Sequence, residues 1–314
     1  MTSPLRADGL HAVKAHGTGN DFVVVVDPDD TWPLDPAVVR ALCDRRTGVG
    51  ADGVIRAVRA DVEGRDGWFM DHVNADGSLA EMCGNGVRVL AHGLVDAGLV
   101  PADAGEVPVL SRAGARPVRL VAGGYPVYAV DMGPVTVADD VVAVTVRQGE
   151  RVRRLPGLAV DVGNPHVVVD VGAAADVLDA DLTVRPGLEP EPSHGANVEL
   201  IGAVGRGEDP HTGYLRMRVH ERGVGETLSC GTGAVAAAVA AASRHAHRRW
   251  TVDVPGGRLR VRLRHREGVG LVGSELAGPA TVVARLVVDH GWLARAQEPA
   301  PAQDETERET TSTR

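Results

Sequence analysis

The stretch Glu226–Ala238, ETLSCGTGAVAAA, joins a polar run to a Cys-Gly-x-Gly turn and then to an alanine-rich segment. Earlier in the chain, Ala80–Leu90 reads AEMCGNGVRVL and repeats this order, with Cys-Gly-x-Gly followed by an apolar run. A polar residue placed directly before a run of helix formers is typical of a helix N-terminus. The sequence therefore predicts two helices that each begin at a cysteine, Cys83 in one half and Cys230 in the other.

The segments around the two motifs follow one order. In each half, apolar strand patterns and an Asn-containing turn come before the cysteine, and further strand patterns come after the helix. The first half also has a helix pattern that begins at Asp35-Pro36 and stops at Gly48, and the second helix is expected over Thr232–Arg244. The repeated order predicts two similar domains of mixed α/β (α+β) class.

Composition excludes several classes of protein. The chain has 314 residues, 44% of them hydrophobic and 24% charged, with a net charge of −9. That length fits two domains, and no apolar run is long enough to span a membrane. The N-terminus lacks a signal-peptide pattern, and the negative charge argues against a nucleic-acid surface. We expect a cytoplasmic enzyme without nucleic-acid or membrane partners, and a disordered tail over residues 294–314.

Cofactor and metal motifs are weak. The three cysteines do not predict a disulfide framework, Cys43 fits a buried inert thiol, and no CxxC or HExxH spacing predicts zinc. Lys14 is the only lysine, so a pyridoxal phosphate enzyme would have to use it. A G-x-G-x-x-G run ends at Gly53, but a helix pattern precedes it and a strand pattern follows it, the reverse of a dinucleotide site. We therefore predict no metal and no cofactor.

The two cysteine motifs suggest a reaction. A helix N-terminus offers unpaired N–H groups and partial positive charge, which lower the pKa of a thiol and bind carboxylates. Two such thiols facing one carbon could invert a stereocentre, one removing the α-proton and the other delivering a proton to the opposite face. Two glycine-capped helices with inert buried cysteines would give the same spacing, so spacing alone leaves both readings open.

Five blocks taken together resemble the diaminopimelate epimerase family. They are HGTGNDFVVVVD (His16–Asp27), NADGSLAEMCGNG (Asn74–Gly86), VGNPH (Val162–His166), GANVELI (Gly195–Ile201) and RVHERGVGETLSCGTGA (Arg218–Ala234). The resemblance implies a cofactor-independent epimerase that interconverts LL- and meso-diaminopimelate in lysine and peptidoglycan-precursor synthesis.

The same resemblance implies a fold and an assembly. Two pseudo-symmetric domains, each a curled, mostly antiparallel sheet around a central helix, would form a homodimer. Residues 1–129 with 279–293 would make the domain of Cys83, and residues 130–278 that of Cys230.

The resemblance also implies roles for particular residues. Cys83 and Cys230 would be the acid–base pair, supported by His166 and Glu221. The N–H groups that hold the reacting carboxylate would belong to Gly84, Asn85, Gly231 and Thr232. The distal end of the substrate would meet Asn74, Asn164, Asn197 and Arg222, with Glu221 at its ammonium group, and Asn20 would line the site.

Chemistry supports this set, although each member has a simpler reading. The Arg222 guanidinium matches a carboxylate in shape and charge. Asn74 and Asn164 could be turn residues, His166 a core histidine, and Glu221-Arg222 a solvated pair at a strand end. One position departs from the family, because Gly53 stands where some members carry Gln.

Three other functions stay open. A proline or hydroxyproline racemase of the same fold would need no distal set. A nucleotide-binding oxidoreductase would use the loop that ends at Gly53. A non-enzymatic binding protein would keep its ligand without either thiol, whereas a cysteine hydrolase has no need of two matched thiols.

Overall fold

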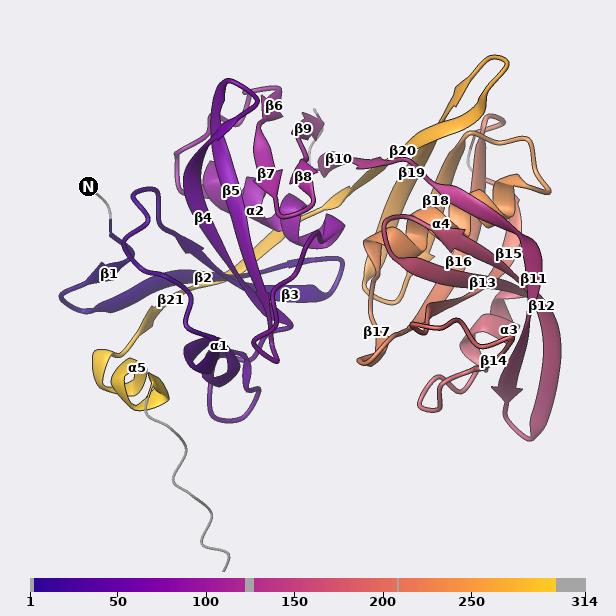
Figure 1. Ribbon diagram of the computed structural model, residues 1–314, viewed down its shortest axis with the longest axis horizontal. Coiled ribbons are helices and arrows are strands. Elements are labelled where there is room, and N and C mark those ends of the chain that lie inside the picture. The colour runs from indigo at the N-terminus through magenta and orange to yellow at the C-terminus, as the bar shows by residue number, and fades with distance from the viewer. Residues whose placement is uncertain (1–2, 122–126, 208, 298–314) are drawn as a thin grey trace, which may run out of the picture.

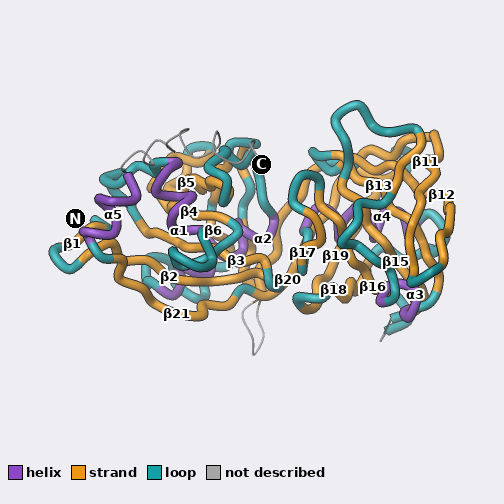
Figure 2. Tube along the Cα trace, turned by 90° about the horizontal axis from the view of Figure 1, so that it is seen from below, coloured by secondary structure: helices purple, strands orange, loops and turns teal. Residues whose placement is uncertain are grey.

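The two alanine- and valine-rich runs that follow the paired cysteines become the central helices of two lobes (Figure 1). The computed structural model describes residues 3–121, 127–207 and 209–297. Helix α2 (Gly84–Asp96) lies inside the first lobe and helix α4 (Gly231–Ala242) inside the second. Figure 2 shows strands surrounding both helices. Nearly every side chain of α4 is buried, as an alanine-rich helix enclosed by a sheet requires.

The first sheet has the strand order β1-β2-β3-β4-β5-β7-β8, and β21 pairs with β2. Its strands are β1 (Leu5–Arg6), β2 (Gly9–Gly17), β3 (Asn20–Val26), β4 (Gly53–Val62), β5 (Arg65–Asn74), β7 (Val109–Ser111), β8 (Gly114–Ala115) and β21 (Thr281–Val288). Helices α1 (Pro36–Cys43) and α5 (His290–Gln297) cover its outer face.

The second sheet has the order β14-β11-β12-β13-β15-β16-β18-β19-β20-β10-β9-β6, and β17 pairs with β16. Helix α3 (Ala174–Leu178) packs on its outer face. The strands are β6 (Glu106–Val107), β9 (Val118–Val121), β10 (Val127–Gly133), β11 (Thr136–Gln148), β12 (Arg151–Asp161), β13 (Pro165–Gly172), β14 (Gly187–Glu189), β15 (Asn197–Arg206), β16 (Thr212–Glu221), β17 (Gly225–Thr227), β18 (Arg249–Val254), β19 (Gly257–Arg266) and β20 (Gly270–Pro279).

The two sheets repeat one pairing order, which confirms the predicted pseudo-symmetry. The pairs β2–β3, β3–β4, β4–β5 and β5–β7 are antiparallel, parallel, antiparallel and parallel. The pairs β12–β13, β13–β15, β15–β16 and β16–β18 follow the same order. In register, Phe22 faces Gly53 as His166 faces Asn197, so these positions correspond between the halves.

The long strands β10 and β20 connect the lobes (Figure 1). Their pairing runs from Val127 opposite Pro279 to Gly133 opposite Ser274, and one apolar core contains residues of both α2 and α4. The division of the chain near Val130 and Gly278 stays a prediction.

The C-terminus differs from expectation. Helix α5 continues to Gln297, whereas the tail was predicted to be disordered from residue 294. Asp289 caps this helix by accepting from the Trp292 N–H at 2.9 Å, and the buried Leu293 ties it to α1. The rest of the predicted tail, residues 298–314, lies outside the described residues.

Candidate active site

Each of the paired cysteines is the N-cap of its central helix. Both have extended backbone, with φ of −141° at Cys83 and −120° at Cys230. The Cys83 sulfur accepts from the Gly86 N–H at 3.3 Å, and the Cys230 sulfur accepts from the Gly233 N–H at 3.4 Å. The two thiols therefore occupy equivalent places at equivalent helices.

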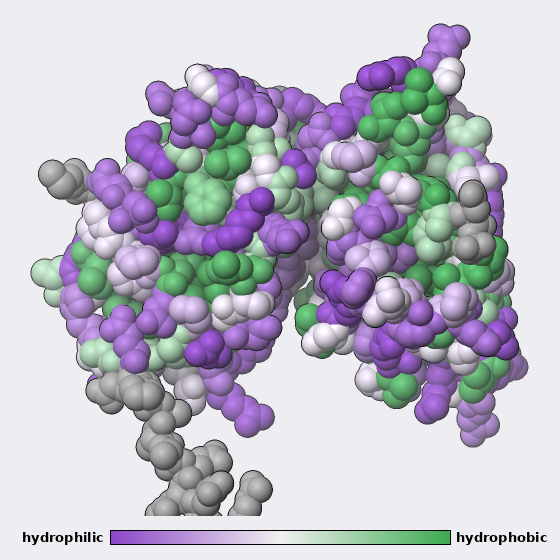
Figure 3. Space-filling view, viewed as in Figure 1, coloured by the Kyte–Doolittle hydropathy of each residue, from purple (hydrophilic) through white to green (hydrophobic). Residues whose placement is uncertain are grey.

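The two helix N-termini meet between the lobes. A Cβ added to Gly231 would lie 3.6 Å from the Gly84 Cα. The Leu276 side chain covers both glycines, because its Cδ2 would lie 2.9 Å from a Cβ added to Gly231 and 3.1 Å from one added to Gly84. The Asn85 amide donates to the Ser229 carbonyl at 3.2 Å, joining the two halves directly. Figure 3 shows a deep notch between the lobes on one face. The positive ends of two helix dipoles therefore converge where an anion could bind.

On the first side, Asn20 is held in one orientation beside Cys83. Its Nδ2 donates to Asp52 at 2.7 Å, and its Oδ1 accepts from Asn85 at 3.2 Å. The same Oδ1 lies 3.8 Å from the Cys83 sulfur. The Asp52 carboxylate is also paired with Arg45 at 2.7 Å, which holds it in place. Asn20 therefore presents an acceptor to the thiol.

On the second side, polar groups gather beside Cys230. The Glu221 carboxylate accepts from the Thr227 hydroxyl, and its charge acts on the Cys230 thiol. The Thr232 hydroxyl lies 3.4 Å from the same sulfur. Behind them, the buried His166 contacts Glu199 through Nδ1 at 2.7 Å.

The predicted distal residues lie at or directly beside the ends of strands. Asn164 Oδ1 is 3.0 Å from His166 Nε2, and Asn197 Oδ1 accepts from the Arg222 backbone N–H at 2.8 Å. The Arg222 guanidinium donates to the His194 carbonyl at 2.7 Å. Asn74, at the end of β5, donates to Ser78 at 3.0 Å, so its side chain also serves a local turn.

The thiol pKa values correct one expectation. Helix N-termini were expected to lower them, but burial raises the pKa of Cys83 and raises that of Cys230 well above its ordinary value. The charges of Glu221 and Glu199 add to the rise at Cys230, while helix N–H groups oppose it. Burial also raises the Glu221 pKa. Desolvation therefore outweighs the helix dipole here, because Cys230 is buried in the apolar core and Cys83 is partly buried against it.

Arg88 was missed by the sequence reading. It is fully buried, donates to the Gly84 carbonyl at 3.1 Å and to the Asn85 side chain at 2.9 Å, and burial lowers its pKa to about 10. It thereby fixes the residues that begin α2. The sequence did carry a sign of this role, because Arg88 interrupts a run of valines and leucines on a helix predicted to be central. A charged residue is rarely buried unless it has partners there.

Gly53 has a local explanation. A Cβ there would lie 2.8 Å from both His72 Nε2 and the Val73 carbonyl, so His72 occupies the space that a longer side chain would need. His72 is buried, and neither ring nitrogen has a hydrogen-bond partner among the described residues. The glycine loop before it lies between α1 and β4, as its pattern predicted.

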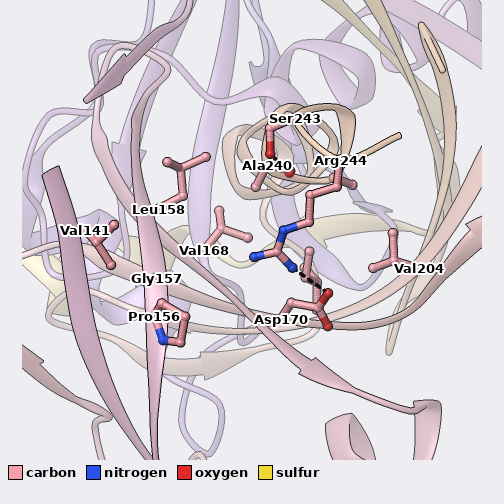
Figure 4. Close-up of a pocket in the computed structure, with 12 residues that line it drawn as sticks. Val141, Pro156, Gly157, Leu158, Val168, Asp170, Val204, Ala240, Ser243 and Arg244 are labelled. Carbon is pink, nitrogen blue, oxygen red and sulfur yellow. Dashed lines mark hydrogen bonds and ion pairs between the residues drawn. The ribbon is translucent and has the colours of Figure 1, made fainter. Parts of the chain in front are cut away.

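A separate pocket lies at the opposite end of α4 (Figure 4). Aliphatic side chains such as Leu158 and Val168 line it, together with the Arg244–Asp170 ion pair at 3.1 Å. It contains neither thiol, so we place the chemistry at the helix N-termini.

In the described part of the chain, no helix is long and apolar enough to cross a bilayer.

Comparison with known proteins gives consistent matches. The family model described as "Diaminopimelate epimerase" matches residues 12–138 and 158–283. A diaminopimelate epimerase of Rhodococcus erythropolis is 44% identical over 89% of this chain and 96% of its own length. One of Thermobifida fusca is 47% identical, covering 88% and 96%. A solved phenazine biosynthesis protein of the PhzF family from Bacillus anthracis shares the fold, with a TM-score of 0.68, 15% identity and 88% and 98% coverage.

Proposed function

Because the chain belongs to the diaminopimelate epimerase family, we propose that it interconverts LL- and meso-diaminopimelate with two thiols and no cofactor. The observation that carries this is the meeting of two thiol-capped helix N-termini around one place between the lobes. A two-domain arrangement with a single thiol would not suit a reaction that must treat both faces of one carbon.

The reacting carboxylate binds between the two helices. The free N–H groups of Gly84, Asn85, Gly231 and Thr232 face it, and both dipoles favour its charge. As the α-proton leaves, negative charge grows on the carbon and its carboxylate, and these same groups stabilise that charge. A Cβ at the first position of α2 or α4 would lie 3.1 or 2.9 Å from Leu276 Cδ2, so glycine leaves this side chain undisturbed where the two helices meet.

Proton transfer runs between the two thiols. Since burial keeps both protonated in the empty site, one proton must leave before the reaction starts. We propose that Glu221, whose charge acts on the Cys230 thiol, accepts that proton. One thiolate then takes the α-proton, the opposite thiol gives a proton to the other face, and the roles exchange in the reverse direction.

The residues that would bind the distal end of the substrate favour diaminopimelate over a cyclic imino acid. Arg222 and Asn197 supply donors for a second carboxylate, and Asn164 and Asn74 line the same side. A proline racemase would gain nothing from this set. The proposal includes a homodimer and a cytoplasmic location, where thiols stay reduced; light scattering of the purified protein tests the first.

The test is α-hydrogen exchange. Reduced protein is mixed with LL-diaminopimelate in deuterated water without added cofactor, and NMR follows the meso product and its deuterium. Cys83→Ala and Cys230→Ala should each abolish inversion, whereas Cys43→Ala, which removes a buried thiol in the α1 cluster, should keep it. Inversion that survives loss of either paired thiol would refute the mechanism, and exchange with proline alone would refute the substrate.

A further inference from the structure

The two halves differ at one matched pair of buried positions. In the first half, Phe22 on β3 and Ile55 on β4 fill the space beneath the first turn of α2. In the second half, His166 on β13 and Glu199 on β15 take the corresponding places beneath α4. An added Cβ on Gly86 would contact Ile55 at 3.0 Å, and one on Gly233 would contact Glu199 at 2.6 Å, which confirms the correspondence.

The polar pair is not required by the fold. The first half builds the same strands and helix over an apolar pair, and all four side chains are at most 1% exposed. A buried ion pair is often no more stabilising than well-packed apolar residues of similar volume. Its presence beside only one of the two thiols therefore points to the chemistry of that side.

The contacts of His166 define what Glu199 does. The imidazole Nδ1 lies 2.7 Å from Glu199 Oε1, and Nε2 lies 3.0 Å from Asn164 Oδ1. Glu199 Oε1 is a hydrogen-bond acceptor, so Nδ1 donates to it, and Nε2 is then left for the side chain of Asn164.

On this basis, and resting on the function proposed above, we propose that Glu199 is a positioning residue. Its carboxylate accepts from His166 Nδ1 and fixes the orientation of the imidazole ring, and His166 Nε2 in turn fixes the amide of Asn164. With Asn164 Oδ1 occupied, the Nδ2 hydrogens of that amide are left to donate to the substrate. The groups that face the pair are Glu221 on β16, whose electrostatics both members alter, and Cys230 at α4.

The relay parallels the arrangement on the first side. There, Asp52 holds Asn20 directly, by accepting from its Nδ2 at 2.7 Å. The two asparagines are consequently fixed in opposite senses: Asn20 offers an oxygen to its thiol side, and Asn164 offers N–H groups. A substrate whose distal carboxylate must lie on one side only would be oriented by this difference.

The first test is spectroscopic and needs no substrate. Nitrogen-15 NMR of the histidine side chains should show a hydrogen-bonded Nδ1 for His166 in the wild-type protein, and a shifted Nδ1 signal in Glu199→Gln, which keeps the shape but not the charge. An Nδ1 signal that is unchanged in Glu199→Gln would overturn the proposal.

The second test is kinetic. Glu199→Gln should raise KM for LL-diaminopimelate about tenfold, the loss expected when one charge-assisted contact is weakened, with kcat changed much less. The double variant His166→Phe/Glu199→Ile, which copies the first half, should fold with a wild-type Tm and show a similar rise in KM. An unfolded double variant would make the pair structural, and a wild-type KM in either variant would refute a positioning role. If the wild-type protein itself fails to epimerise diaminopimelate, the proposed function fails, while the NMR result still stands.

Discussion

Gly256 offers a direct way to separate the two lobes. It lies in the turn between β18 and β19, and a Cβ added there would sit 1.7 Å from the carbonyl oxygen of Thr18, in the turn between β2 and β3. Real Cβ atoms essentially never approach closer than 3.0 Å, so Gly256→Ala must part these backbones by roughly 1.3 Å. Because Thr18 also hydrogen-bonds Ser229, directly before Cys230, the displacement reaches the thiol.

The expected result is a large loss of activity with a modest loss of stability. A misplacement of about 1 Å can cost on the order of a hundredfold in rate. We expect kcat/KM for epimerisation to fall by about that factor, measured by NMR with LL-diaminopimelate, while the far-UV circular dichroism stays unchanged. Gly205→Ala is the matched control, because an added Cβ there meets nothing within 4 Å. Wild-type kcat/KM in Gly256→Ala would refute the reasoning that the closed contact of the turns positions the thiols.

Three further predictions concern the first lobe. Gly53→Gln should lower the free energy of unfolding, measured in urea, by about 1–3 kcal/mol, because the new side chain would overpack against His72. Adding His72→Ala to this variant should restore part of the loss. A urea midpoint that is unchanged in Gly53→Gln would contradict the crowding at this position. His72 has its pKa lowered to about 4 by burial, so the unfolded chain binds its proton first and stability should fall by about 3 kcal/mol as pH drops from 6.5 to 4. His72→Phe should reduce this loss of stability at low pH. An equal dependence of the free energy of unfolding on pH in the wild-type protein and in His72→Phe would refute the assignment of the loss to His72. Asp52→Ala should free the Asn20 amide and lower kcat about tenfold with little change in Tm, whereas the exposed Asp29→Ala should leave both unchanged.

Much of the fold could be read from the sequence, because the signals were local and repeated. Cys-Gly-x-Gly before an apolar run predicted both helix starts to within a residue or two. The apolar runs Phe22–Val26 and Val54–Val58 predicted strands, and they lie within the observed strands Asn20–Val26 and Gly53–Val62. The helix over residues 290–297 was missed, since its cap and its contact with α1 join positions that a one-dimensional pattern does not connect.

The site was less accessible. The sequence motifs predicted the thiols and the asparagines of the site. They did not predict the thiol pKa values, because burial reversed the expected direction of those shifts. Glu199 looked like one polar residue in a strand, GANVELI, and Arg88 like one in a helix. Only the pairing of β13 with β15 brings Glu199 to His166, and only the folded lobe buries Arg88 with its partners Asn85 and Thr18. Residue type identifies the chemistry, whereas long-range pairing decides which groups are buried together.

The pairing of β21 with β2 has a consequence for how the chain is made. The register runs from Leu10 opposite Val288 to His16 opposite Thr281, so the second strand of the chain cannot pair along this edge until the last strand, β21, has been synthesised. While the ribosome completes the second lobe, the edge of β2 stays unpaired, and such edges invite association with other chains. The lobe that is synthesised first is thus the last to be completed. A stop codon that removes only residues 281 onward would leave the Cys230 lobe able to assemble beside an open-edged partner, a nascent state suited to chaperone binding.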